Sequence, residues 1–270
     1  MNTKKTIVAA LALAGLATSA LAGGPYELGD GNSTATFDTA SGQINWTVDG
    51  VSQLFGQEFY FRRAGDTREY RLDSTNMSLD GVFATDTNPF TDTRDDTFGQ
   101  LYSDGQGLQI ETRFSLLGGT AGSGMSDLAE QIILRNNSNA TMTISFFQFV
   151  DFDLGGDAFD DFGQIVGGNT AQQSDDDGFF ISETVVTPLP ALFQMGSSAD
   201  LNNLFNDGAI SNLDGTASFS GDVAWAFQWN ITMAAGQSFL ISKDKLVVPT
   251  PGTMALLGAA GFMASRRRRS

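Results

Sequence analysis

The sequence contains neither cysteine nor histidine among its 270 residues. Without cysteine the chain cannot form disulfides, so its stability must come from a packed core. Without histidine the Ser-His-Asp and Cys-His catalytic arrangements are impossible, and zinc sites built on His or Cys are excluded. No G-x-S-x-G nucleophile motif and no phosphate-binding glycine loop occur either. Carboxylates are therefore the main groups left for chemistry or metal binding.

Lysine and glutamate are also scarce. Between the two ends of the chain the only lysines are Lys243 and Lys245, and the 31 acidic residues comprise 25 Asp and only 6 Glu. Glu and Lys are typical of helix surfaces, whereas Asp favours turns and calcium loops. With 31 Gly and 22 Phe as well, the composition predicts strands and turns rather than helices.

The N-terminus has the layout of a secretory signal peptide. Two lysines precede an apolar run at residues 7–16, and small residues follow at the positions that a signal peptidase reads. The run is shorter than the roughly 20 residues of a membrane-spanning helix. We therefore predict a signal peptide at 1–22, with a cleavage site formed by Ala20, Ala22 and Gly23.

Removal of both predicted targeting segments leaves nine basic and 31 acidic residues, a net charge of −22. Such a body is repelled by nucleic acids and by anionic membrane surfaces. Cations, calcium in particular, are its natural counter-partners.

The C-terminus combines three features in order. A proline motif comes first, then an apolar segment at 252–265 without charge, then an arginine cluster. As a helix the apolar segment would measure about 21 Å, less than a hydrocarbon core of about 30 Å, and the arginines would stay on the cytoplasmic side. This favours temporary retention in the inner membrane over a permanent tail anchor. The residues concerned are Val248, Pro249, Thr250, Pro251, Arg266, Arg267, Arg268 and Arg269.

This layout resembles the PEP-CTERM sorting signal, which exosortases recognise in bacteria with an outer membrane. Thr250 stands where that family usually has glutamate. The resemblance covers 247–270 and implies processing by an exosortase-like enzyme after signal peptidase. It also implies delivery to the cell surface or extracellular matrix, alongside exopolysaccharide, and it says nothing of an activity.

The body, 23–246, shows repeated period-2 alternation. Trp46 and Val48 alternate with Ile44 before an Asp49-Gly50 hairpin signal. Similar alternation runs over 108–116 and 223–231, whereas 142–149 is apolar on both faces, as in a central strand. One helix is predicted over 199–206, capped by Ser198. We predict a single all-β domain, an antiparallel β-sandwich.

The stretch "DFDLGGDAFDDFG" is the strongest local cluster of acids. It follows the predicted central strand, and its glycines allow the chain to bend. Calcium takes six to eight oxygen ligands on a flexible loop, so the stretch is a calcium-site hypothesis, with a solvated acidic turn as the alternative. The candidate ligands are Asp151, Asp153, Asp157, Asp160 and Asp161.

Two other hypotheses concern sugars. Glu111 and Glu130 lie among apolar strand residues, where burial would raise their pKa as in a glycosidase acid, although we expect both on the solvent face. Trp46, Trp225 and Trp229 could stack on sugar rings, although their apolar neighbours favour a place in the core.

The sequence thus predicts an exported surface or matrix protein with a structural or binding role, not an enzyme. A calcium-dependent carbohydrate-binding module is the first alternative, and a carboxylate-based glycoside hydrolase the second.

Overall fold

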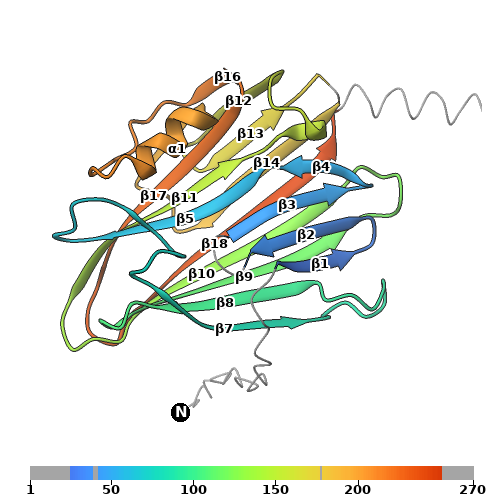
Figure 1. The fold of residues 1–270 in the computed structure, drawn as a ribbon. Helices are drawn as coiled ribbons and strands as arrows, with labels where there is room; N and C mark the ends of the chain where they lie inside the picture. Colours follow the sequence, from blue (N-terminus) through green and yellow to red (C-terminus); the bar gives the residue numbers. More distant parts are fainter. Residues whose placement is uncertain (1–24, 39–41, 177, 251–270) are drawn as a thin grey trace, which may run out of the picture.

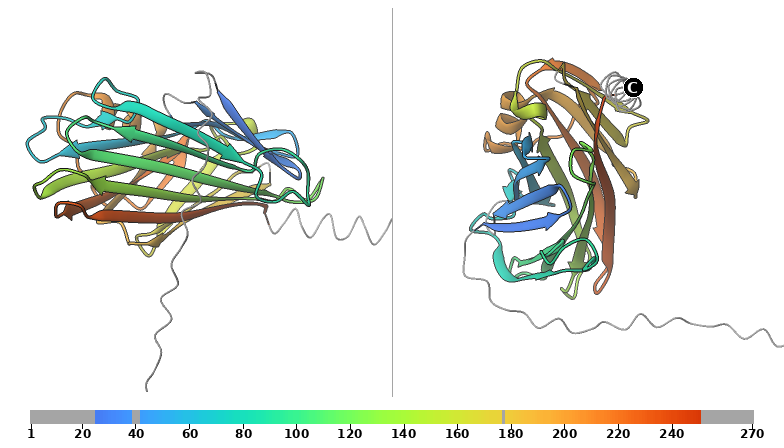
Figure 2. Two further views of the ribbon diagram at one scale, coloured as in Figure 1. Left: turned by 90° about the horizontal axis from the view of Figure 1, so that it is seen from below. Right: turned by 90° about the vertical axis from the view of Figure 1, so that its right-hand side faces the viewer.

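The structure is a computed structural model that describes residues 25–38, 42–176 and 178–250. Two antiparallel sheets of nine strands each lie face to face, as the two layers in Figure 2 show. The predicted all-β sandwich is confirmed. The calls on Ala20, Ala22, Gly23, Pro251 and Arg266 to Arg269 fall outside the described residues.

The first layer, sheet A, contains the first strands of the described chain (Figure 1). Its strands, in spatial order, are β1 (Tyr26–Asp30), β2 (Ser33–Asp38), β3 (Gly42–Val48), β5 (Gly56–Arg63), β11 (Met142–Asp151), β17 (Val223–Met233) and β15 (Leu192–Ser197). Two short strands pair at its side, β4 (Val51–Leu54) with β3 and β6 (Tyr70–Arg71) with β5.

The second layer, sheet B, is built around the last strand of the described chain. Its order is β16 (Ser218–Gly221), β12 (Asp161–Val166), β13 (Thr170–Ser174), β14 (Phe179–Thr187), β18 (Ser238–Pro249), β10 (Ser126–Asn136), β9 (Leu108–Gly118), β8 (Thr97–Ser103) and β7 (Ser78–Thr85). A short 3-10 turn, η1 (Leu154–Gly156), follows β11.

The Asp49-Gly50 hairpin forms as predicted between β3 and β4. Both residues have positive φ, 52° and 81°, which is the backbone of the turn that fits the twist of adjacent strands. The alternation in β3 differs from the prediction at one place. Ile44 is exposed, because a β-bulge opposite Thr36 and Phe37 shifts the register there and turns Ile44 out of the core.

The central strand is β11, between β5 and β17, and both of its faces are buried as predicted. Phe146 faces the other sheet, whereas Phe147 and Phe149 lie on the outer face of sheet A. There the helix α1 (Ser198–Asn206) covers them with Leu201 and Phe205.

The helix confirms the prediction over 199–206, but its cap is one residue earlier. The Ser197 side chain accepts a hydrogen bond from the Asp200 N–H at 3.1 Å, so Ser197 is the N-cap. Ser198 is the first helical residue, and its hydroxyl donates to the Asp151 carboxylate instead.

The final strand, β18, continues past residue 246, the predicted end of the body. Val248 and Pro249 pair with Phe180 and Phe179 of β14, so both belong to sheet B. Pairing with β10 ends at Val247. Pro249 has no strand partner on that side, and this explains why its missing N–H is tolerated.

No helix within the described residues is long and apolar enough to cross a bilayer.

Candidate functional site

The two glutamates considered as catalytic acids are both paired with cations. Glu130 points into the sandwich rather than to solvent, because it shares its strand face with Leu128 and Ile132. It forms ion pairs with Lys243 and Lys245. Burial alone would raise its pKa, but the two lysine charges and their hydrogen bonds lower it to about 2. The expectations of a raised pKa and of a solvent-facing side chain were wrong for Glu130.

Glu111 lies on the outer face of sheet B, as predicted from alternation, yet it is largely covered. Its carboxylate pairs with Arg113 and, at 2.6 Å, with Arg135. These cations hold Glu111 in an ion-pair network on the outer face of sheet B, so its carboxylate is occupied by the chain's own arginines.

All three tryptophans are buried in the interior of the sandwich. Trp46 Nε1 donates to Ser126 Oγ at 3.0 Å, and Trp225 stacks on Phe152 with ring centroids 5.4 Å apart. The core interpretation is confirmed for Trp46, Trp225 and Trp229, and none of them offers a face to a sugar.

Three aspartates converge at one end of the sandwich. Asp151 ends β11, Asp153 follows it, and Asp222 lies in the turn between β16 and β17. One carboxylate oxygen from each lies within 4.8 Å of the others. Strand pairing brings them together, since Asp151 pairs with Ala224, two residues beyond Asp222. The sequence cluster had included the first two residues and missed Asp222.

The other three predicted ligands, Asp157, Asp160 and Asp161, lie outside this group. Asp161 begins β12, opposite Gly221, and is buried. Asp157 and Asp160 are exposed on the connecting loop, where Asp157 caps the local turn by accepting from the Phe159 N–H at 3.0 Å. The grouping of three carboxylates therefore contains Asp151 and Asp153 but not Asp157, Asp160 or Asp161.

The carboxyls at this end interact mainly with one another. Burial, with the charges of Asp153 and Asp222, raises the pKa of Asp151 to about 7. Burial, with the charge of Asp175 among others, raises the pKa of Asp161 to about 7. The pKa values of Asp153 and Asp222 are raised too, chiefly by burial. A region with these properties attracts protons or metal cations.

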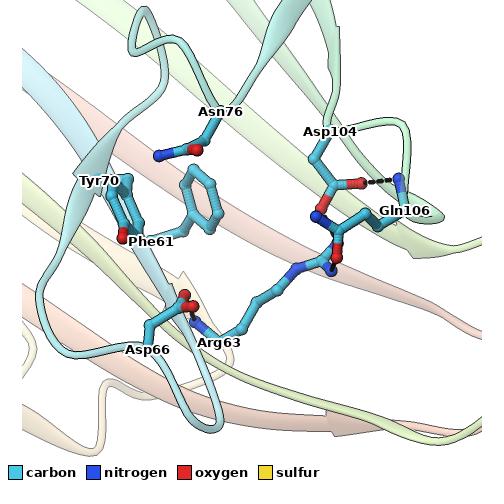
Figure 3. A pocket seen from close by; sticks show the side chains of 7 residues that line it. All are labelled: Phe61, Arg63, Asp66, Tyr70, Asn76, Asp104 and Gln106. Atoms are coloured by element: carbon cyan, nitrogen blue, oxygen red, sulfur yellow. Dashed lines mark hydrogen bonds and ion pairs between the residues drawn. The ribbon is translucent and has the colours of Figure 1, made fainter.

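A hollow of about 90 Å³ lies at the end of β5 that contains Arg63, as Figure 3 shows. Its residues come from β5, from β6 and the turn before it, from the segment before β7 and from the β8–β9 turn. They are Phe61, Arg63, Asp66, Tyr70, Asn76, Asp104 and Gln106.

Aromatic rings form one wall of this hollow. Phe61 and Tyr70 pack with ring centroids 6.0 Å apart and planes inclined by 43°. Tyr70 is half-buried, whereas Phe61 is fully buried beneath it. The guanidinium of Arg68 lies 5.4 Å from the centre of the Tyr70 ring.

Polar planar groups form the opposite wall. Arg63 pairs with Asp104 and donates to Gln106 Oε1 at 3.1 Å, while its backbone N–H donates to Asp66 at 2.7 Å. Asp104 also accepts from the Gln106 N–H at 2.8 Å (Figure 3). Both carboxylates are thus held by donors of the chain itself, which gives the wall a fixed shape.

A second hollow of about 230 Å³ shares Arg63 and Asp66 with the first. Its remaining lining is Arg62, Ala64, Gly65, Thr143, Ser145 and Ile210. The turn at 64–66 therefore lies beside two adjoining hollows.

No family model matches this chain, and no curated protein does. Solved structures do match its fold. It is similar to part of a bacterial glucoamylase that was solved in complex with acarbose, with a TM-score of 0.57, 9% sequence identity and 91% of this chain covered. This chain spans 37% of the glucoamylase. It is also similar to a galactose mutarotase-like protein from Lactobacillus casei, with a TM-score of 0.50, 10% identity, and coverage of 83% of this chain and 100% of that one.

At such low identities these likenesses show the fold alone, a large antiparallel β-sandwich that the proteins share. Function must be argued from the site. No sequence pattern indicated the hollow beside Tyr70, because its seven residues come from separate segments and include no motif.

Proposed function

We propose that this protein binds carbohydrate through the hollow beside Tyr70, and that it does so as an exported protein of the cell surface or matrix. The observation that carries the proposal is the pairing of a half-buried tyrosine ring with a wall of fixed planar polar groups. Binding pockets commonly combine aromatic surface with a few well-placed polar side chains. A sugar ring offers the matching surfaces, an apolar C–H face and a rim of hydroxyls.

The size of the site argues for recognition of a short stretch of glycan. The hollow beside Tyr70 is small, and the adjoining one extends it past Arg63 and Asp66. Together they suit a few sugar units lying across the 64–66 turn. The exposed guanidinium of Arg68 has no carboxylate partner among the described residues, so it is available to an acidic sugar.

Export supports this function but rests on the terminal segments. The predicted signal peptide would export the protein. A sorting signal at 247–270, which the resemblance implies, would then bring it to the place where exopolysaccharide accumulates. Signal peptidase and an exosortase-like enzyme are the processing partners in this proposal.

Catalysis is a weaker explanation for the same features. In the hollow, Asp66 and Asp104 are occupied by hydrogen bonds and an ion pair, and elsewhere Glu111 and Glu130 are paired with cations. The two structural neighbours carry the names of carbohydrate enzymes, so a turnover assay belongs beside every binding assay.

The test is calorimetric titration of the full chain with a neutral glucan and with a polyuronate. Tyr70→Ala should weaken binding by tenfold or more, since loss of an aromatic stacking face costs about 1 kcal/mol beyond the lost area. Phe90→Ala, which removes a fully exposed ring from a different loop, should bind as the wild type does. If neither polymer shows saturable binding, the proposal is refuted. Release of reducing sugar would show that the protein is an enzyme rather than a binding protein.

A further inference from the structure

We propose that Asp151, Asp153 and Asp222 form a divalent-cation site, best suited to calcium, that fastens the end of the sandwich. Their three carboxylate oxygens lie within 4.8 Å of one another. Calcium binds oxygen at 2.3–2.6 Å, so two ligand atoms on one ion are at most about 5 Å apart. The three oxygens are therefore close enough together to share a single ion after small side-chain shifts.

The site joins two separate parts of the chain. Asp151 is the last residue of β11, Asp153 precedes η1, and Asp222 links β16 of sheet B to β17 of sheet A. A bound ion would therefore fasten the two sheets to each other at this end. In a protein without cysteine, such a cross-link replaces what a disulfide does elsewhere.

The negative charge at this end has no cationic partner in the described chain. None of the ion pairs in the described residues includes Asp151, Asp153 or Asp222. The only charged groups that act on the pKa values of these carboxyls are other aspartates. Elsewhere the fold pairs its buried acids, as Glu130 shows with Lys243 and Lys245. The missing counter-charge at Asp151 is thus an exception within the same protein.

Buried oxygens without a partner provide an independent observation. Asp151 is buried, with Ser198 Oγ donating to its Oδ2 at 2.5 Å, yet its Oδ1 has no hydrogen-bond partner. Asp161 lies outside the group of three, close enough to respond to the charge of Asp153. It is also buried, and neither of its oxygens has a hydrogen bond of normal geometry.

One N–H of the Gln173 amide donates to the Phe152 carbonyl at 2.8 Å, and the same amide acts as a neighbouring donor that lowers the pKa of Asp161. Buried polar atoms in folded proteins nearly always have a partner, so Asp151 Oδ1 indicates a ligand that the protein chain itself does not supply. A cation bound by the three carboxylates would satisfy this oxygen.

The cation site does not depend on the proposed sugar site. Gly56, at the start of β5, pairs with Asp151, whereas Arg63, at its end, lines the sugar hollow. Eight residues of strand separate the two places by roughly 25 Å. Calcium therefore acts here on the fold and does not bridge protein and sugar, so either site can fail its test without the other.

The experiment is thermal unfolding of the full chain in EDTA and in increasing calcium chloride, with calorimetry to count bound ions. At about a hundred times the dissociation constant, calcium should raise Tm by roughly 5 °C or more, reversibly on chelation. Calorimetry should give one ion per chain.

Asp153→Asn and Asp222→Asn should each abolish the calcium-dependent rise. In EDTA both variants should melt at or above the wild-type temperature, because each removes one of several mutually repelling charges, and this verifies that they fold. Asp80→Asn, an exposed aspartate on β7, is the matched control and should keep the full rise. Identical wild-type melting with calcium and with EDTA would overturn the proposal, as would a rise that persists in both variants.

Discussion

The ammonium of Lys243 lies 3.1 Å from the Glu183 carboxylate, with both side chains wholly shielded from solvent. Lys243 also pairs with Glu130, which in turn pairs with Lys245. Glu130 stands directly opposite Lys243 in the β10–β18 ladder, and Glu183 opposite Lys245 in the β14–β18 ladder. The only lysines of the described chain thus form a four-residue network of balanced charge inside the sandwich.

Lys243→Met tests how far the fold depends on that balance. The substitution leaves one buried carboxylate in excess, and breaking a buried pair from one side costs about 3–5 kcal/mol. We expect the free energy of unfolding in urea to fall by about that amount. A change below about 1 kcal/mol would show that the remaining glutamate is solvated by water or neutralised by a proton at little cost.

The double variant Lys243→Met with Glu183→Gln is the matched comparison. It keeps the network neutral, leaving Glu130 with Lys245, and the glutamine can still accept from Trp225. We expect it to be more stable than the Lys243→Met single variant, because charges in one network do not act additively.

Trp225→Phe tests a hydrogen bond that Trp225 donates to the four-residue network. Trp225 Nε1 donates to Glu183 Oε2 at 2.7 Å, and its ring stacks on Phe152. Phenylalanine retains most of the stacking but removes the donor from a buried carboxylate, for a cost of about 1–3 kcal/mol. Equilibrium unfolding measures the loss. Trp229→Phe is the control with a neutral acceptor, since Trp229 Nε1 donates to the Pro188 carbonyl at 3.1 Å, and it should cost less.

Much of the fold could be predicted from alternation and turn chemistry. The alternating run from Val223 to Ile231 forms a strand and Asp49-Gly50 forms a tight hairpin, as predicted. The other face of that strand is also covered, because Ala224 and Ala226 pack in the cluster beneath helix α1. Alternation was less decisive in "LISKDKLV", where apolar residues occupy both parities. Lys243 and Lys245 share their face with Ile241 and Val247, so the face that enters the core is the charged one. Only the partners on β10 and β14 explain that choice.

The candidate sites depended on contacts that no local pattern contains. Asp151 and Asp153 could be singled out because they follow an apolar strand, but Asp222 joins them only through the pairing of β11 with β17. Tyr70 and Asn76 likewise meet Asp104 only after β5, β6, β8 and β9 have assembled. Long-range strand pairing, rather than composition, determines both sites.

Ser197→Ala tests the corrected helix cap. Ser197 accepts the Asp200 N–H, so alanine should cost about 1 kcal/mol of stability, while Ser197→Asn should retain most of it. Urea unfolding of the three proteins measures the difference. Equal stability of the alanine and asparagine variants would contradict the assignment of Ser197 as the cap.

Asp127→Asn tests a carboxyl pair on the outer face of sheet B. Burial, together with the neighbouring charge of Asp244 on β18, raises the pKa of Asp127 to about 6 from an ordinary value of 3.8. A group whose pKa is higher in the folded state gives its full stabilisation below the unfolded pKa and loses it as pH rises through the folded one. Asp127 should therefore contribute a fall in stability between about pH 4 and pH 7.

The asparagine variant cannot ionise, so its Tm relative to wild type should be higher at pH 8 than at pH 4.5. Asp80→Asn, on the exposed edge strand β7, should change Tm equally at both values. Melting curves in EDTA at the two pH values make the comparison, with chelation removing any effect of a bound cation. An Asp127→Asn shift that is the same at pH 4.5 and pH 8 would contradict the raised pKa of Asp127.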